Sequence, residues 1–433
     1  MKRRALNALV LLVTISVSGL SCNRNTGDRP TQQDKSGEHE IIKIELENRT
    51  GASQEVEVIT LESGDQVVMV PGDGWATMDV PVKVPGRYKI EVRLLSGPVA
   101  GVSCWVEDYH NNKDDRQYNI TGSMEVPVSD QKSQLVTVSR DGSPLNQGLH
   151  KMKLHVDGGM AGIDAISFTL LKKHRETPQV LTQHTKGEQW KVVWSDEFEE
   201  SGSPDTSKWT YDIGNWGWGN NELQYYTEGR SENARIENGN LVIESHKNDL
   251  QEKWTSARLT TRGKTSFIYG KIEIRAKVPV EKGNWTAGWT LGDAYVDELS
   301  WPYCGEIDIM ECVGYEIDDS TGNGLHHASV HCGAYYFKLN NQPTAITEVK
   351  NMGEEFHLYA IEWTPDYIKA YVDDLHYFTY EDTSDSLTWP YNEPQNLILN
   401  LAMGGGWGGA RGMDESVTSQ KIVIDYIRVY ERR

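Results

Sequence analysis

The sequence predicts an all-β protein in which a large β-jelly-roll sandwich follows a smaller β-sandwich. Short runs of alternating apolar and polar residues recur along the chain, and turn residues separate them. No long segment shows the 3.6-residue period of an amphipathic helix. The later part of the chain also lacks strand–helix alternation, which argues against a parallel α/β sheet.

Residues 39–172 are expected to form the smaller sandwich. Tyr88–Leu94 and Met152–Val156 alternate strictly between apolar and polar side chains, as half-buried strands do. Turn pairs such as Pro85–Gly86 and Gly158–Gly159 separate these runs.

Residues 173–189 are polar and show no periodicity, so we interpret them as a linker. Residues 190–433 repeat the strand pattern on a larger scale, and a two-sheet jelly roll is the expected fold. The strand-like runs in this part are Asn240–Ser245, Lys271–Val278, Glu306–Cys312, Tyr359–Trp363, Ile368–Val372, Asn396–Leu401 and Ile422–Tyr430.

The composition restricts the partners. The 433 residues include 43 Lys and Arg against 63 Asp and Glu, a net charge of -20 that disfavours binding to nucleic acid or to anionic lipid. The 14 Trp and 20 Tyr far outnumber the 6 Phe, so most rings carry a polar group. Such rings suit stacking against sugars, although they also serve ordinary cores.

The N-terminus has the features of a secretory signal. A basic start, Met1–Arg4, precedes the apolar run Ala5–Val17, and Gly19–Cys22 places small residues before a cysteine. This ending resembles a bacterial lipoprotein signal, so residues 1–22 are expected to direct export and Cys22 to carry the lipid. Residues 23–38 would then tether the protein to the membrane, which it contacts through this anchor only. The alternative is an ordinary cleaved signal.

The remaining cysteines match no zinc-binding or redox spacing. Cys312 and Cys332 could pair across neighbouring strands, and the alternative is that all four are buried free thiols. These cysteines are Cys104, Cys304, Cys312 and Cys332.

The segment Cys304–Cys312 carries the most specific chemical signal. In a regular strand Glu306 and Asp308 share one face, whereas Glu311 would point to the other. A β-bulge at Ile309–Met310 would return Glu311 to the side of the first two acids.

Two glutamates placed in this way suit glycoside hydrolysis. Their backbones would lie about 13 Å apart, and inward-leaning side chains would bring the carboxyls to about 5–6 Å. Retaining glycosidases use a separation of about 5–5.5 Å, with one carboxylate attacking the anomeric carbon and the other acting as acid and base. Asp308 could share a proton with Glu306. The alternatives are a solvated acidic strand and a calcium site.

Trp301–Glu311 resembles the active-site strand of family 16 glycoside hydrolases, in the bulged form typical of laminarinases. The resemblance extends over essentially all of Trp190–Arg433. Its other landmarks are Trp194–Phe198, Trp218–Tyr226, Ser256–Thr260, Phe356–Trp363, Asn400–Gly405 and Asp425–Tyr430.

The resemblance implies roles for individual residues. Glu306 would be the nucleophile, Glu311 the acid/base and Asp308 their electrostatic partner, with no cofactor needed for catalysis. Trp301 would lie under the sugar beside the scissile bond, while His331 could instead be a hydrogen-bonded core residue. The expected substrate-binding residues are Trp218, Asn220, Arg258, Trp285, Trp289, Trp301, His331 and Asn400.

The resemblance also implies a structural calcium ion far from the chemistry. Its ligands would be the Asp425 side chain and backbone oxygens near Glu197 and Gly239.

Part of the smaller sandwich, Gly72–Val92 with Gly162–Phe168, resembles a family 6 carbohydrate-binding module. The aromatic residues Trp105, Tyr109 and Tyr118 are candidates for contacting sugar. The alternative is a spacer that holds the larger sandwich away from the membrane.

These observations predict a monomeric endo-β-1,3-glucanase of the laminarinase type that cleaves β-glucan by double displacement. One alternative is the same mechanism on mixed-linkage β-1,3-1,4-glucan or on an agar-type galactan. A second alternative is a non-catalytic glucan-binding protein, although such a protein would be expected to lose one of the glutamates.

Overall fold

The computed structural model describes residues 40–433 except 55, 98, 110–117 and 130–133. The predicted signal, Cys22 and the tether therefore lie outside the described residues. None of the helices in the described part of the chain is long and apolar enough to cross a membrane.

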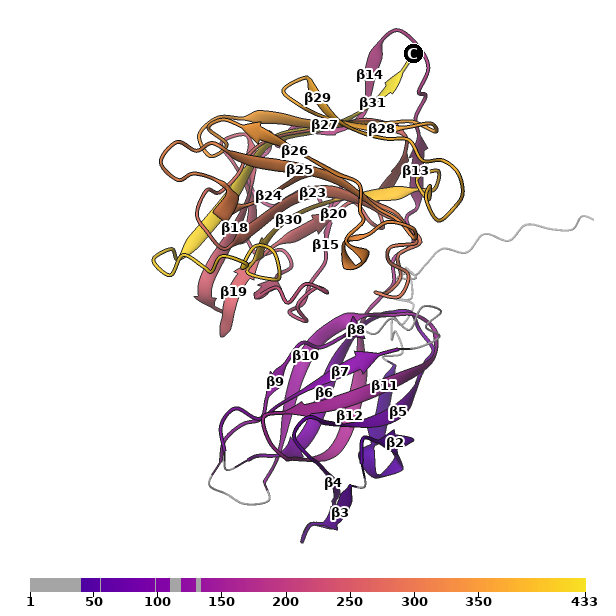
Figure 1. The fold of residues 1–433 in the computed structure, drawn as a ribbon, viewed down its shortest axis with the longest axis vertical. Helices are drawn as coiled ribbons and strands as arrows, with labels where there is room; N and C mark the ends of the chain where they lie inside the picture. Colours follow the sequence, from indigo (N-terminus) through magenta and orange to yellow (C-terminus); the bar gives the residue numbers. More distant parts are fainter. Residues whose placement is uncertain (1–39, 55, 98, 110–117, 130–133) are drawn as a thin grey trace, which may run out of the picture. The chain divides into compact units, whose positions relative to one another are not determined.

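Residues 41–173 form the predicted smaller sandwich (Figure 1), in which the described strands make two antiparallel sheets of six strands each. One sheet runs β10-β6-β12-β4-β3, with β1 beside β12. The other runs β2-β5-β11-β7-β8, with β9 beside β7. Their bounds are β1 (Ile41–Glu45), β2 (Gly51–Ala52), β3 (Glu57–Thr60), β4 (Gln66–Val70), β5 (Gly74–Val82), β6 (Gly86–Leu95), β7 (Ser103–Asp108), β8 (Tyr118–Asn119), β9 (Met124–Glu125), β10 (Leu135–Leu145), β11 (Gly148–Asp157) and β12 (Ala161–Lys173), with a 3-10 turn η1 (Leu46–Asn48).

The alternation predicted along the smaller sandwich is what builds its core. In β6 the apolar positions Tyr88, Ile90, Val92 and Leu94 are all fully buried, while the residues between them stay partly exposed. One face of β6 therefore packs inward and the other remains partly accessible.

The larger sandwich packs a nine-stranded sheet on a ten-stranded sheet, again counting the strands of the described residues. The first runs β13-β21-β30-β23-β24-β25-β26, with β20 beside β30 and β15 beside β20. Its bounds are β13 (Gln179–Thr182), β15 (Thr210–Tyr211), β20 (Arg258–Thr260), β21 (Thr265–Ile268), β23 (Asn284–Gly292), β24 (Glu306–Val313), β25 (Gly324–His331), β26 (Thr344–Val349) and β30 (Gln395–Met403).

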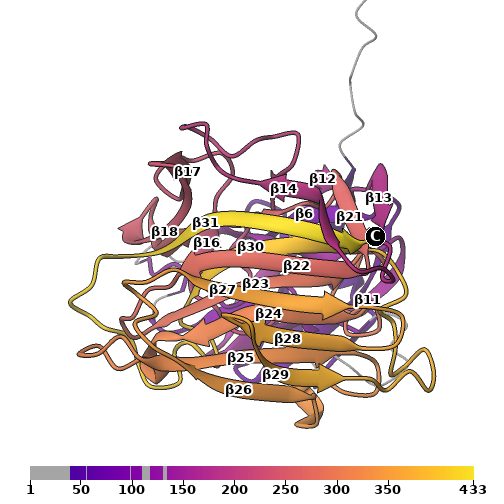
Figure 2. The same ribbon diagram turned by 90° about the horizontal axis from the view of Figure 1, so that it is seen from above.

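The ten-stranded sheet runs β16-β19-β18-β31-β22-β27-β28-β29, with β14 beside β31 and β17 beside β18. Figure 2 shows β31, β22, β27 and β28 side by side in this order. The bounds are β14 (Trp190–Asp196), β16 (Gln224–Tyr226), β17 (Ala234–Glu237), β18 (Asn240–Asp249), β19 (Glu252–Ser256), β22 (Gly270–Lys277), β27 (His357–Trp363), β28 (Ile368–Val372), β29 (Leu375–Tyr380) and β31 (Ser419–Arg432), and two short 3-10 turns are η2 (Gly314–Glu316) and η3 (Phe337–Leu339).

The linker prediction needs a correction. Within residues 173–189, β13 pairs in parallel with β21 and so belongs to the nine-stranded sheet. A strand of four residues among polar neighbours is too short to show a clear alternation of apolar and polar side chains. Its strand conformation comes from pairing with β21 rather than from its own sequence pattern.

Cys104, Cys304, Cys312 and Cys332 are all buried and unpaired. The free-thiol alternative is therefore the one the structure adopts, and burial raises the pKa of the Cys104 thiol to about 12.

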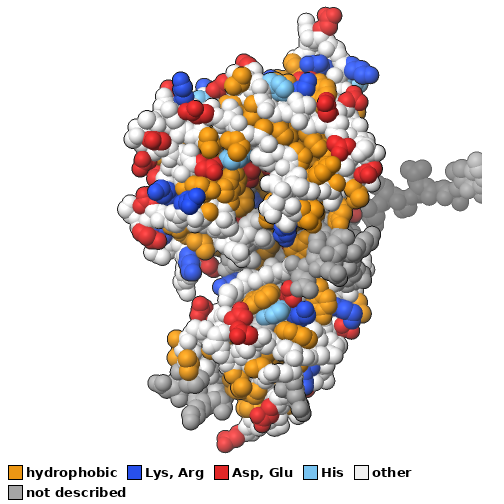
Figure 3. All heavy atoms as spheres, viewed as in Figure 1, with side chains coloured by type: hydrophobic (Ala, Val, Ile, Leu, Met, Phe, Trp, Pro, Cys, Tyr) orange, Lys and Arg blue, Asp and Glu red, His pale blue; other side chains and the backbone are white. Residues whose placement is uncertain are grey.

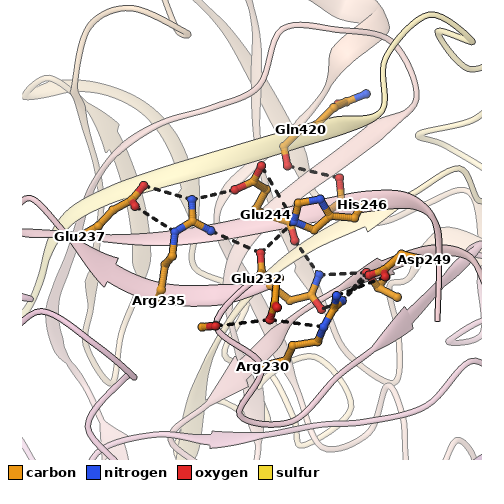
Figure 4. Close-up of polar contacts among 12 residues, drawn as sticks. Arg230, Glu232, Arg235, Glu237, Glu244, His246, Asp249 and Gln420 are labelled. Carbon is orange, nitrogen blue, oxygen red and sulfur yellow. Dashed lines mark hydrogen bonds and ion pairs between the residues drawn. The ribbon is translucent and has the colours of Figure 1, made fainter.

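The strand pair β17–β18 carries a charged network that Figure 4 shows in detail. The Arg235 guanidinium donates to both carboxylate oxygens of Glu237 (3.0 and 3.1 Å) and to Glu244 (2.8 Å). Arg230 pairs in the same way with Asp249. Over the face that Figure 3 draws, acidic and basic side chains are similarly interspersed rather than gathered into one patch.

Candidate active site

The predicted bulge is present in β24. On one side Asp308 pairs with Trp289 and Met310 pairs with Gly288, which leaves Ile309 as the extra residue. The register to β25 also shifts between Asp308 and Glu311. As a result, both glutamates and the aspartate line a single cleft, as predicted from the spacing of the three acids.

The cleft has a volume of about 560 Å³ and lies on both sides of β24. Residues of β20, β30 and β23 line it on one side of that strand, and residues of β25 and β26 line it on the other. All eight predicted substrate-binding residues line it, namely Trp218, Asn220, Arg258, Trp285, Trp289, Trp301, His331 and Asn400.

Each glutamate receives a hydrogen bond from a tryptophan. The indole N–H of Trp301 donates to Glu306 Oε2 at 2.9 Å, and that of Trp285 donates to Glu311 Oε1 at 2.9 Å. The two rings therefore wall the cleft and also orient the carboxyls. The other oxygen of each carboxyl receives no hydrogen bond from that tryptophan.

The three acids are hard to ionise. Burial raises the pKa of Glu306 to about 8, with a further contribution from Asp308, while His331 and the Trp301 hydrogen bond act in the opposite direction. Burial and Asp308 also raise the pKa of Glu311 to about 8, and burial raises that of Asp308 to about 8. A carboxyl that stays protonated near neutral pH can serve as a general acid.

His331 faces the acids rather than a separate core. Its Nε2 lies 3.4 Å from Asp308 Oδ2 and 3.8 Å from Glu306 Oε1. The ring centroid lies 5.8 Å from that of Trp301. His331 therefore lines the cleft, where it was predicted to lie. It is also close enough to Glu306 to influence the charge of that carboxyl.

One side of the cleft is built around Arg258. Its guanidinium lies 4.8 Å from the ring centroids of both Trp218 and Trp289, and its Nε donates to Asp212 at 3.3 Å. The Trp289 indole N–H in turn donates to Asn400 at 2.8 Å. This network fixes the Trp218 and Trp289 rings on one side of the cleft.

Several cleft residues were not singled out from the sequence. Trp407 contacts Trp285 edge-on at 5.3 Å and His327 at 4.9 Å, and it comes from a glycine-rich loop without periodicity. Burial raises the pKa of Glu222 to about 7, although bonds from Gln224 and Asn220 oppose this shift. Among the further cleft residues missed are Trp216, Tyr295, Glu298, Phe337 and Lys338.

Two groups of residues bear on metal binding. Glu306, Asp308 and His331 offer ligand atoms within 4.8 Å of one another, but these are the groups that glycosidase chemistry uses without a metal.

At the predicted calcium site, the Asp425 carboxylate accepts a hydrogen bond from Arg275. The Arg275 guanidinium thus occupies the one side chain that was predicted to bind calcium, and the other predicted ligands are backbone oxygens.

A pair of glutamates on one strand, held in an aromatic cleft on the face of the nine-stranded sheet away from the core, defines the site of a glycoside hydrolase. The comparisons with known proteins agree. The family described as glycosyl hydrolases family 16 matches residues 218–428. A β-glucanase of Rhodothermus marinus is 45% identical over an alignment of 253 residues, and the match covers 57% of this chain and 86% of that protein.

Solved structures give the same result. The laminarinase from Rhodothermus marinus aligns with a TM-score of 0.52 at 45% identity, over 56% of this chain and 98% of that one. SCLam, a non-specific endo-β-1,3(4)-glucanase, aligns with a TM-score of 0.52 at 38% identity, over 59% of this chain and 98% of that one. The chain belongs to glycosyl hydrolases family 16 and is an O-glycosyl hydrolase with the predicted jelly-roll fold.

Proposed function

We propose that this protein is a retaining endo-β-1,3-glucanase that cleaves laminarin-type glucan by double displacement. The observation that carries the proposal is the bulged strand β24, which directs the side chains of Glu306 and Glu311 into the same aromatic cleft. A tryptophan N–H there donates a hydrogen bond to each of the two carboxyls. Relatives named as a laminarinase and as an endo-β-1,3(4)-glucanase support the substrate.

In the first step, protonated Glu311 gives its proton to the glycosidic oxygen while the Glu306 carboxylate attacks the anomeric carbon. The glycosidic bond breaks as the ester bond to Glu306 forms, and the first sugar product leaves. In the second step, the Glu311 carboxylate removes a proton from water, whose oxygen attacks the anomeric carbon and releases Glu306. Asp308 raises the pKa of both glutamates and so favours the protonated acid.

Cleavage within a chain, rather than from its end, is supported by the extent of the cleft. Its walls on both sides of β24 offer contacts to sugars before and after the scissile bond. Trp218 and Arg258 lie on one side, and Ser329 and Thr344 lie on the other.

The test is the release of reducing sugar from laminarin, lichenan and agarose by wild type and by Glu306→Gln. We expect preferential release from laminarin and none by the variant. Activity on lichenan or agarose alone would preserve the mechanism and replace the substrate with the mixed-linkage or galactan alternative. Inactivity of wild type on all three would favour the glucan-binding alternative.

The smaller sandwich has a feature that supports glucan binding. On one sheet His155 pairs with Trp75 of β5 and with Trp105 of β7, so three partly exposed rings form one row across the strands. The rings of Trp105 and His155 stack at 3.9 Å. The candidate Tyr118 is buried and does not join this row.

We therefore propose that this row holds insoluble glucan near the cleft-bearing sandwich. Trp75→Ala with Trp105→Ala should weaken co-sedimentation of the full chain with an insoluble β-1,3-glucan and leave hydrolysis of soluble oligosaccharides unchanged. Unchanged co-sedimentation would favour the spacer alternative.

The remaining sequence predictions are kept as proposals. Export and lipid attachment at Cys22 would be tested by labelling with a radioactive fatty acid, which Cys22→Ser should abolish. The structural calcium, which the Asp425–Arg275 pair disfavours, would be tested by thermal melting with calcium and with a chelator. A monomer would be tested by light scattering.

A further inference from the structure

The backbone of the bulge in β24 contacts a buried side chain of the next strand. The N–H of Glu311 donates to Nε2 of His326 on β25, at 3.4 Å. His326 is fully buried, and its neighbour His327 lines the cleft, so the two histidines occupy opposite faces of the sheet. His326 therefore reaches the bulge from the side of the core.

Two tyrosines of the ten-stranded sheet fix the His326 ring. The Tyr377 hydroxyl lies 2.9 Å from Nδ1, and the Tyr359 ring stacks on the imidazole at 4.6 Å. Because Nε2 accepts a hydrogen bond, the neutral ring carries its proton on Nδ1 and donates it to the Tyr377 oxygen. Burial lowers the pKa of His326 to about 3, so this arrangement persists at working pH.

We propose that His326 is a positioning residue that sets the direction of the acid/base Glu311 by holding the backbone of the bulge. On the β25 side the pairing register shifts between Asp308 and Glu311, so Ile309 and Met310 have no paired residue of β25 and pairing resumes only at Glu311. His326, held in place by Tyr377 of the ten-stranded sheet, adds a side-chain contact to the Glu311 backbone where this irregular stretch ends. The inference rests on the proposed role of Glu311 and deepens it.

The test distinguishes a misoriented Glu311 carboxyl from a general loss of protein stability. A sugar leaving group needs protonation, whereas 2,4-dinitrophenolate leaves without it. The kcat/KM for a laminari-oligosaccharide and for 2,4-dinitrophenyl β-laminaribioside is therefore measured for four variants of the full chain. They are His326→Leu, His326→Gln, Glu311→Gln as the reference, and His357→Leu as a matched control.

His326→Leu should lower kcat/KM for the oligosaccharide by about tenfold to a hundredfold, the usual effect of a group displaced by about 1 Å. It should change kcat/KM for the dinitrophenyl substrate by no more than about threefold, and shift the basic limb of the pH profile for the oligosaccharide. His326→Gln, which keeps an acceptor near the position of Nε2, should restore most of the loss.

The control removes another buried histidine without touching the bulge, because His357 bonds Asp373 instead. His357→Leu should affect both substrates equally. Tyr377→Phe, which removes the partner of Nδ1, should give a smaller loss of the same selective kind as His326→Leu, even if the leucine variant folds poorly.

Equal losses on both substrates, or no rescue by His326→Gln, would overturn the role of His326 while leaving Glu311 as the acid/base. If Glu311→Gln itself shows no selective loss on the oligosaccharide, the proposed role of Glu311 fails and the role of His326 fails with it.

Discussion

The carboxylates of the cleft and those of the β17–β18 network are chemically alike but differ in their partners. In the network, Arg235 donates to both oxygens of Glu237, and this hydrogen bonding lowers the pKa of that carboxyl. In the cleft, Glu306 and Glu311 receive indole N–H groups instead of a cation, and burial raises their pKa to about 8.

This difference shows how a glutamate on a strand becomes either a structural ion or a proton donor. A guanidinium stabilises the charged form, whereas a neutral donor in a buried site compensates only part of the cost of removing the charge from water. The guanidinium that does line the cleft, that of Arg258, bonds Asp212 rather than the glutamates. The acids consequently keep a proton available for the leaving group.

The largest expected effect comes from removing the nucleophile. Glu306→Gln should lower kcat on laminarin by at least about 10⁴-fold, because the covalent intermediate cannot form. The neutral amide can still meet the Trp301 N–H, so binding of the oligosaccharide in calorimetry should persist. Turnover within tenfold of wild type would exclude Glu306 as the nucleophile.

Removing the charge between the glutamates should have a smaller effect. Asp308 raises the pKa of Glu306 and of Glu311, so Asp308→Asn should lower both values. Glu311 would then lose its proton at a lower pH, and the basic limb of the kcat/KM profile should move to lower pH, with a loss of about tenfold to a hundredfold near pH 7. A basic limb that stays in place would show that Asp308 does not set the acidity of the pair.

The raised pKa values also predict how stability depends on pH. Because burial raises the pKa of these acids, the folded protein holds more protons on the three side chains between about pH 4 and pH 8 than the unfolded chain does. Their contribution to stability is therefore complete at low pH and is lost as pH rises through about 8.

The variant combining Glu306→Gln, Asp308→Asn and Glu311→Gln should lack this decline. Its Tm should exceed that of wild type by a few degrees at pH 9, and the difference should shrink at pH 5. Melting curves at both pH values test this, and parallel Tm values across the range would show that the three acids are not buried as protonated groups.

The smallest effect is expected in the charged network. Arg235→Met removes an ion pair at a partly exposed site, which should change the free energy of unfolding by no more than about 1 kcal/mol and leave kcat unchanged. Urea unfolding and laminarin assays measure both quantities. A tenfold loss of activity would mean that the network couples to the cleft.

The fold and the central part of the site followed from local patterns. The acids at Glu306, Asp308 and Glu311 allowed only one position for a bulge that gathers them, and the spacing of Trp285 and Trp289 placed both rings on one face. Alternation of side chains with a period of two involves only neighbouring residues, so it can be recognised from the sequence of one strand without knowing its partners.

Features that depend on distant partners were missed. The strand β13 exists through its pairing with β21, and Trp407 reaches the cleft through a loop whose path no periodicity describes. Nothing near His326 in the sequence indicates that it meets the Glu311 backbone, because the contact depends on two strands and on Tyr377 of the other sheet.

The most direct test of the account is covalent trapping with a 2-deoxy-2-fluoro-laminaribiosyl fluoride, followed by peptide mass spectrometry. The account predicts one label of the mass of a fluorinated laminaribiosyl group, carried by Glu306 in the peptide that contains Asp308 and Glu311. A label on Glu311, or inversion of configuration at the anomeric carbon without any label, would contradict it.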